Sequence, residues 1–101
     1  MMKVYQTDVF SNWVDGLKDE QVRSRVLVRV ERLTLGNPGD VKPVGKGVSE
    51  LRIHYGQGYR VYYKQEGKVF VILLAGGNKK TQPQDIKNAI DLAENLEEPI
   101  S

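Results

Sequence analysis

The spacing of apolar residues divides the chain into helices and strands. In three segments apolar residues recur every three or four positions, which predicts helices with one apolar side. Elsewhere they alternate with polar residues between glycine turns, or run continuously, which is typical of β-strands. These patterns predict one α+β domain over residues 1–101, with the element order β-α-α-β-β-β-α and a small antiparallel-rich sheet packed on helices. The expected elements are a strand at 3–5, helices at 8–17 and 19–35, strands at 48–55, 59–64 and 69–75, and a helix at 82–97.

Each predicted helix has an apolar stripe that we expect to be buried. In the first helix, Trp13 is expected to pack in the core, and Thr7 or Asp8 to cap the amino end. In the last helix, Thr81 and Gln84 have the spacing of a capping box, and Pro99 is expected to limit the helix. The expected buried positions of the last two helices are Val22, Val26, Val30, Leu33, Ile86, Ala89, Ile90, Ala93 and Leu96.

The second predicted helix also has a basic stripe. Arg25, Arg29 and Arg32 recur at helical spacing and should share one side of the helix. This side is either a solvated surface or a cationic ridge that binds RNA phosphates or an acidic segment of a partner. Arg25 and Arg29 are therefore candidate RNA-binding residues, as is Lys46 in the Pro/Gly loop expected at 40–47.

The segment 69–75 is apolar on both faces, which predicts a central strand covered on both sides. Gly76 and Gly77 then permit a close approach of the backbone. Lys79 and Lys80 follow at the carboxyl end of this strand, where they place two positive charges.

The pairing of the two preceding strands is predicted from the length of their loop. If residues 56–58 form the loop, His54 faces Arg60 and Arg52 faces Tyr62. All four side chains then lie on one face of the sheet, within roughly 5–8 Å of one another at Cβ. These four side chains favour a surface that binds a phosphate backbone and on which a base stacks against Tyr62. The hypothesis requires that the guanidinium and phenol groups point outward together, into a cleft open to solvent.

These residues also have structural interpretations. Arg60 can pair with Glu50 on the same face of the sheet, and His54 can be an ordinary surface histidine. Lys79 and Lys80 can simply solvate a turn. Three further tyrosines are expected to pack against the helices or the sheet edge rather than touch a ligand: Tyr55, Tyr59 and Tyr63.

The distribution of charge favours a polyanionic partner. The chain has 15 Lys and Arg against 13 Asp and Glu, a net charge of +2. Five of the acidic residues but only one basic residue follow position 80, so the preceding body is distinctly basic. The absence of cysteine excludes disulfides and thiolate metal sites. A single histidine without acidic partners at ligand spacing predicts no bound metal.

The chain has neither the apolar core of a signal peptide nor a run approaching the roughly 20 apolar residues of a membrane span. We therefore expect a cytoplasmic protein without a membrane partner. The glycines of 40–47 lack the phosphate-loop pattern G-x-x-x-x-G-K-[ST], which argues against nucleotide binding.

Three stretches carry a resemblance to a known family. They are VGKGVSELRI at 44–53, GYRVYY at 58–63 and ILLAGGNKKTQ at 72–82, followed by Asp85, Ile86 and Ala89. With these residues the chain resembles the RelE/HigB-like toxins of bacterial toxin–antitoxin modules, and more narrowly the phage-derived addiction module killer proteins. Gyrase-poisoning relatives of the ParE type share the same scaffold.

The resemblance implies a ribosome-dependent mRNA endonuclease that uses no metal and no cofactor. In such enzymes the ribose 2′-hydroxyl attacks the neighbouring phosphorus, leaving a 2′,3′-cyclic phosphate and a 5′-hydroxyl. Arg60 matches the family's strand arginine and would stabilise the phosphorane, with Arg52 as a second phosphate contact. Lys79 or Lys80 would supply another cation, and His54 or a lysine would transfer a proton.

The resemblance also implies partners. These are mRNA on the ribosome and a cognate antitoxin of the helix-turn-helix type, with the toxin a monomer alone or a dimer through the antitoxin complex. Two alternatives remain open at this point. One is a ParE-like toxin that inhibits gyrase, and the other is a catalytically inactive member that only binds its antitoxin.

Overall fold

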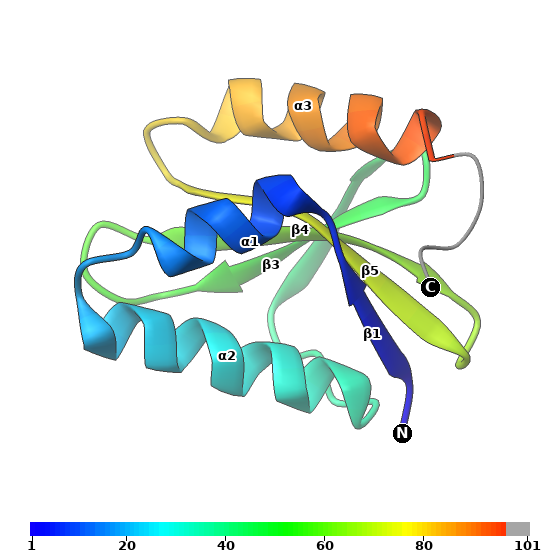
Figure 1. Ribbon diagram of the computed structural model, residues 1–101, viewed down its shortest axis with the longest axis horizontal. Helices are drawn as coiled ribbons and strands as arrows, with labels where there is room; N and C mark the ends of the chain where they lie inside the picture. The colour runs from blue at the N-terminus through cyan, green and yellow to red at the C-terminus, as the bar shows by residue number, and fades with distance from the viewer. Residues whose placement is uncertain (97–101) are drawn as a thin grey trace.

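The predicted α+β class and order of helices are confirmed by a computed structural model, which describes residues 1–96 (Figure 1). A five-stranded sheet has helices on both sides. The elements are β1 (Lys3–Gln6), α1 (Asp8–Asp15), α2 (Glu20–Thr34), β2 (Val41–Gly45), β3 (Val48–Ile53), β4 (Tyr59–Glu66), β5 (Phe70–Asn78) and α3 (Gln82–Glu94). No helix in this part of the chain is long and apolar enough to cross a bilayer.

The strands lie in the order β1-β5-β4-β3-β2. β1 pairs with β5 in parallel, and the other neighbours are antiparallel. β2 is a strand that the sequence analysis expected to be a loop. Its Pro43 lacks an amide hydrogen, which an edge strand tolerates, and Val41 pairs with Leu51 of β3.

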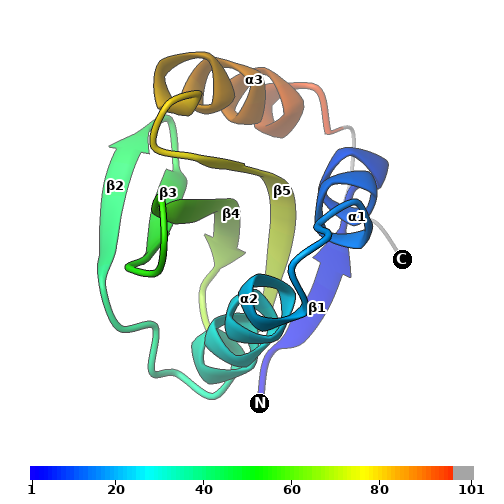
Figure 2. The ribbon, with the colours of Figure 1, turned by 90° about the vertical axis from the view of Figure 1, so that its left-hand side faces the viewer.

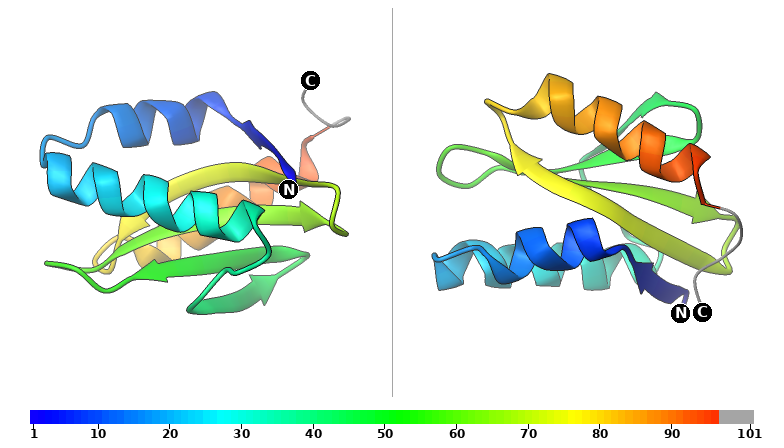
Figure 3. Two further views of the ribbon diagram at one scale, coloured as in Figure 1. Left: turned by 90° about the horizontal axis from the view of Figure 1, so that it is seen from below. Right: turned by 45° about the horizontal axis from the view of Figure 1, so that its top comes forward.

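Each face of the sheet buries its own apolar cluster. Figure 2 shows α3 over one face and α2 over the other, and Figure 3 shows α1 beside α2. The α1/α2 side contains the expected valines and Leu33 of α2, with Phe10 and Val14 of α1. The α3 side packs Ala89 and Ala93 against Tyr62 and Leu74. The two apolar stripes predicted for α2 and α3 therefore both face the sheet.

β5 is covered on both faces, as expected, and carries residues of both clusters. It is not the central strand, however, because β4 lies in the middle of the five and β5 lies between β1 and β4. Trp13 of α1 is partly buried and packs against the core, as predicted, and its ring lies against Gly76 of β5. A Cβ added at Gly76 would lie 2.1 Å from a ring carbon of Trp13, so only glycine permits this approach.

The predicted register of the β3–β4 hairpin is wrong by two residues. Arg52 pairs with Arg60 and Glu50 with Tyr62, so the connection spans residues 54–58 rather than 56–58. The loop is longer because Gly58 donates its amide to Tyr55 and closes a turn inside the connection. A shift of two keeps every side chain on its predicted face, since strand faces alternate with period two.

The two predicted helix caps have different outcomes. Thr7 caps α1 by accepting a hydrogen bond from the amide of Phe10 at 3.1 Å. The predicted capping box at Thr81 is wrong, because the Thr81 hydroxyl donates to Asp85 and the side-chain amide of Gln84 donates to Asn88. α3 ends at Glu94, earlier than predicted, and Pro99 lies outside the described residues.

Candidate functional site: a cationic pocket at one end of the sheet

A buried carboxylate organises the polar side chains between the sheet and α3. Glu50 of β3 has no exposed surface. Its Oε1 accepts a hydrogen bond from Arg52 Nε at 2.9 Å, and its Oε2 accepts from Gln82 of α3 at 2.7 Å and from the Tyr62 hydroxyl at 3.1 Å. The Nε of Arg60 lies 3.5 Å from the same oxygen. Three elements thus converge on one negative charge.

The protonation states follow from these contacts. Burial acts to raise the pKa of Glu50, but the hydrogen bonds from Arg52, Gln82 and Tyr62 and the charge of Arg60 outweigh it and hold the pKa below its ordinary value. Burial and then the negative charge of Glu50 raise the pKa of Tyr62 above its ordinary value. The network therefore pairs an ionised carboxylate with a neutral phenol.

The two arginines beside Glu50 both line a pocket of about 340 Å³. The side chain of Arg52 is 29% exposed and that of Arg60 is 12% exposed, so both keep some access to solvent. Lys79, in the turn after β5, lines the same pocket. Figure 1 shows the β3–β4 loop and the β5–α3 turn on the same side of the molecule.

Gly58 brings two of these cations together. Its φ of +83° is in the region that favours glycine, and its carbonyl accepts the amide of Lys79 at 3.2 Å. A Cβ at this position would lie 3.6 Å from an amino nitrogen of Arg60 and 3.7 Å from Cβ of Lys79. Arg60 and Lys79 therefore flank the bare backbone of Gly58.

A histidine–aspartate pair lies at the rim of the pocket. The Nε2 of His54 is 2.5 Å from Oδ2 of Asp40, in the segment just before β2. This hydrogen bond, with the charges of His54, Arg52 and Arg29, holds the pKa of Asp40 below its ordinary value, so the carboxylate stays ionised near His54. The sequence analysis missed Asp40 because it did not recognise β2, which brings this residue beside β3.

The pocket has the composition of an anion site. Three cations line it, together with the imidazole of His54 and the rings of Tyr55 and Tyr59. Arginine and lysine bind phosphate through charge-assisted hydrogen bonds, and an imidazole near a carboxylate can transfer a proton. Within residues 1–96 no group of three His, Cys, Asp or Glu side chains is placed to hold a metal ion.

Four of the nine predicted site residues gather here: Arg52, His54, Arg60 and Lys79. Tyr62 does not, and its proposed stacking on a base is wrong, because α3 covers this face of the sheet and leaves Tyr62 fully buried. The prediction that the guanidinium and phenol groups point together into an open cleft is therefore wrong for the phenol of Tyr62. Arg60 also makes the structural pairing with Glu50 that the sequence left open.

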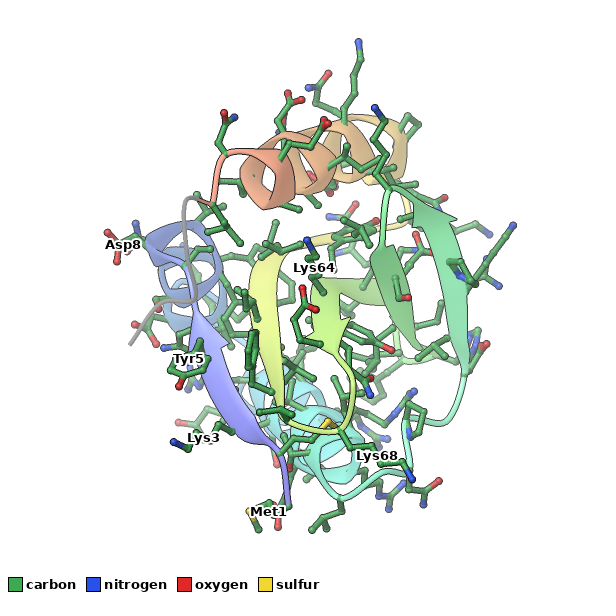
Figure 4. All side chains as sticks on the ribbon, turned by 90° about the vertical axis from the view of Figure 1, so that its right-hand side faces the viewer. Met1, Lys3, Tyr5, Asp8, Lys64 and Lys68 are labelled. Carbon is green, nitrogen blue, oxygen red and sulfur yellow. The ribbon has the colours of Figure 1, made fainter. Side chains whose placement is uncertain are left out.

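The predicted lysines beyond the pocket lie elsewhere. Lys80 is exposed, adjoins Lys79 and does not line the pocket. Lys46 is in the β2–β3 turn at the opposite end of β3, where it pairs with Glu94 at 3.5 Å. That end of β4, seen in Figure 4, carries Lys64, which pairs with Glu66 at 3.7 Å.

The two predicted residues of α2 lie beside the pocket rather than in it. Arg29 donates to the carbonyl of Arg52 at 2.6 Å and to that of Pro38 at 3.0 Å, so it braces the backbone of β3. The guanidinium of Arg25 lies 4.1 Å from the ring centre of Tyr55.

Comparison with known proteins assigns the family. Residues 12–98 match the family model described as "Phage derived protein Gp49-like", which covers most of the chain, and the protein belongs to this family of phage-derived proteins. It is also 46% identical over 95 residues to an uncharacterized protein of Haemophilus influenzae, covering 94% of this chain and 96% of that protein. Membership of the Gp49-like family is consistent with the toxin of an addiction module.

Proposed function

We propose that this protein is the toxin of a bacterial toxin–antitoxin module and acts as a ribosome-dependent mRNA endonuclease. The observation that carries the proposal is the convergence of Arg52, Arg60 and Lys79 on one pocket whose rim holds His54. Three cations fit a phosphodiester and the extra negative charge that it gains when attacked. Membership of the Gp49-like family supports the toxin part of the proposal, and the resemblance to RelE/HigB-like toxins favours the nuclease.

The proposed reaction is an internal transphosphorylation. The ribose 2′-oxygen loses its proton and bonds to the adjacent phosphorus, and the bond from phosphorus to the 5′-oxygen breaks. The products are a 2′,3′-cyclic phosphate and a 5′-oxygen, which takes up a proton and becomes a hydroxyl. Arg60 and Lys79, on either side of Gly58, would hold the non-bridging oxygens, and Arg52 would add a third positive charge.

His54 is the proposed proton-transfer group. Its contact with the ionised Asp40 orients the ring that would accept the 2′-hydroxyl proton. Tyr59, which lines the pocket, takes the role first given to Tyr62 of contacting a base. Its hydroxyl accepts a hydrogen bond at 3.1 Å from Gln57, which lines the same pocket.

A second candidate is a toxin or module member that binds without cutting. The pairing of Arg60 with buried Glu50 favours it, because this contact gives Arg60 a structural role. A gyrase inhibitor of the ParE type and an inactive antitoxin-binding member both belong to this class. An assay of DNA supercoiling by gyrase separates the first of these from the nuclease.

The test is translation of a reporter mRNA in a cell-free extract with the purified protein. The proposal expects cuts within translated codons, and fragments whose 3′ ends carry a 2′,3′-cyclic phosphate. The same mRNA without translation should stay intact. Intact mRNA under translation, together with loss of gyrase supercoiling, would replace the nuclease with the gyrase inhibitor. If the protein neither cleaves the mRNA nor inhibits gyrase, the inactive antitoxin-binding member is the remaining candidate.

The proposed partner is a small helix-turn-helix antitoxin that neutralises the toxin. Expression of the chain alone should arrest growth, and expression of the adjacent open reading frame should restore it. Co-purification of the two products would then give the stoichiometry of the complex.

A further inference from the structure

One side of α2 and the end of β3 form a second concave surface next to the pocket. We call it the α2 groove, and its lining includes Arg25, Val28, Arg29, Arg32, Ile53 and His54. It has a volume of about 350 Å³. Val28 lines the groove and is 44% exposed, and the preceding residue of α2, Leu27, is 51% exposed.

The arginines of the α2 groove have no direct carboxylate partner within the described chain. Among residues 1–96 no carboxylate lies within 4.0 Å of the guanidinium of Arg25, Arg29 or Arg32. The contacts of Arg29 are to backbone carbonyls, which carry no net charge. Asp40 is close enough for the charge of Arg29 to lower its pKa, but its carboxylate is hydrogen-bonded to His54. The groove therefore presents positive charge around an apolar side chain.

We propose that the α2 groove docks an acidic, amphipathic segment of a partner protein. Carboxylates of the segment would pair with Arg25 and Arg32, and an apolar side chain would cover Val28. RNA fits this surface less well than a peptide, because a phosphate backbone gains nothing from Val28 or from the adjacent Leu27. The combination of positive charge and exposed aliphatic groups favours the peptide.

Docking would also affect access to the cationic pocket. His54 lines both the α2 groove and the pocket, so a segment seated on α2 reaches the pocket rim. The docking itself does not depend on the proposed RNA cleavage, and it can be tested by binding alone.

The experiment measures fluorescence anisotropy with a labelled peptide of about 15 residues, in which Leu recurs at helical spacing beside Glu. We expect saturable binding to the purified full chain. Arg32→Glu should weaken it about tenfold or more, an effect of at least about 1.4 kcal/mol. Val28→Ser should weaken it through the apolar contact. Arg32 and Val28 are only partly packed, so both variants should fold, which circular dichroism checks.

The matched control is Lys87→Glu, which makes the same change of charge on α3, across the sheet from α2. It should leave the affinity within about twofold. No binding of the peptide, or equal losses for Arg32→Glu and Lys87→Glu, would overturn the proposal. The proposal would also be overturned if a single-stranded RNA bound the protein more tightly than the peptide does, and if Arg32→Glu but not Lys79→Ala weakened the binding of that RNA. The Lys79→Ala arm separates the groove from the pocket.

Discussion

At the scale of single residues, the fold and the site depend on the same carboxylate. Glu50 has no exposed surface and takes three hydrogen bonds, from Arg52, Gln82 and Tyr62. Such a buried charge is tolerated because each of its carboxylate oxygens accepts at least one hydrogen bond. The same contacts fix the direction of Arg52, one of the cations of the pocket.

We predict that Glu50→Gln lowers the free energy of unfolding at neutral pH by about 3 kcal/mol, because two arginines lose their counter-charge. Because folding lowers the pKa of Glu50, its contribution is fully present above its ordinary value of 4.5 and is lost as the pH falls through the lower folded value. The difference in stability between wild type and variant should therefore shrink below pH 4.5. Urea unfolding at a series of pH values measures it.

The control for this experiment is Glu66→Gln, which removes an exposed carboxylate 3.7 Å from Lys64 on β4. Surface pairs of this kind contribute little, so the change should stay within about 0.5 kcal/mol. A loss from Glu50→Gln no larger than that from Glu66→Gln would contradict the role assigned to the buried network.

The site residues could be predicted from the sequence only in part, for reasons visible at individual positions. Strict alternation put Arg52 and Arg60 on one face, and this survived the error in register because the error was two residues. Alternation does not tell whether that face is open or covered. Tyr62 was therefore assigned to solvent, although α3 packs on it.

At the scale of elements, α1 is positioned by a close contact with β5. Gly76 of β5 has the ring of Trp13 directly against it, with no room for a side chain. The ring also packs against Phe10, at a centroid distance of 5.9 Å. A glycine in a strand often marks such an approach, and the sequence analysis identified the position though not its partner.

We predict that Gly76→Ala destabilises the protein by about 2 kcal/mol, because the added methyl group would lie 2.1 Å from Trp13. In a Trp13→Leu background the same substitution should lower the free energy of unfolding by less, because the ring that the methyl group would contact is absent. Thermal unfolding of the four proteins of this cycle gives the coupling energy. Equal costs of Gly76→Ala in both backgrounds would show that the Trp13 contact does not position α1.

The elements differ in how well the sequence predicts them. The helices were found because their apolar stripes are long and regular. β2 was not found, because Pro43 and the surrounding glycines resemble a loop and its residues are mostly exposed at the edge of the sheet. With β2 missing, Asp40 had no predicted place beside β3, and its contact with His54 was missed as well.

At the scale of the whole molecule, the three cations that line the pocket lie at one end of the sheet. Arg52 and Arg60 lie near the β3–β4 connection. Lys79 follows β5, whose carboxyl end lies beside that connection. The α2 groove adjoins this end through His54. One end of the fold thus combines the cationic pocket with the adjacent α2 groove.

The most direct test of the proposed pocket compares two adjacent lysines in the cell-free translation assay. Lys79 lines the pocket and Lys80 does not, and both are exposed, so both alanine variants should fold. We expect Lys79→Ala to slow cleavage of the reporter mRNA on the order of 10²-fold. Lys80→Ala should leave the rate within about twofold of wild type. Equal rates for the two variants would contradict the account.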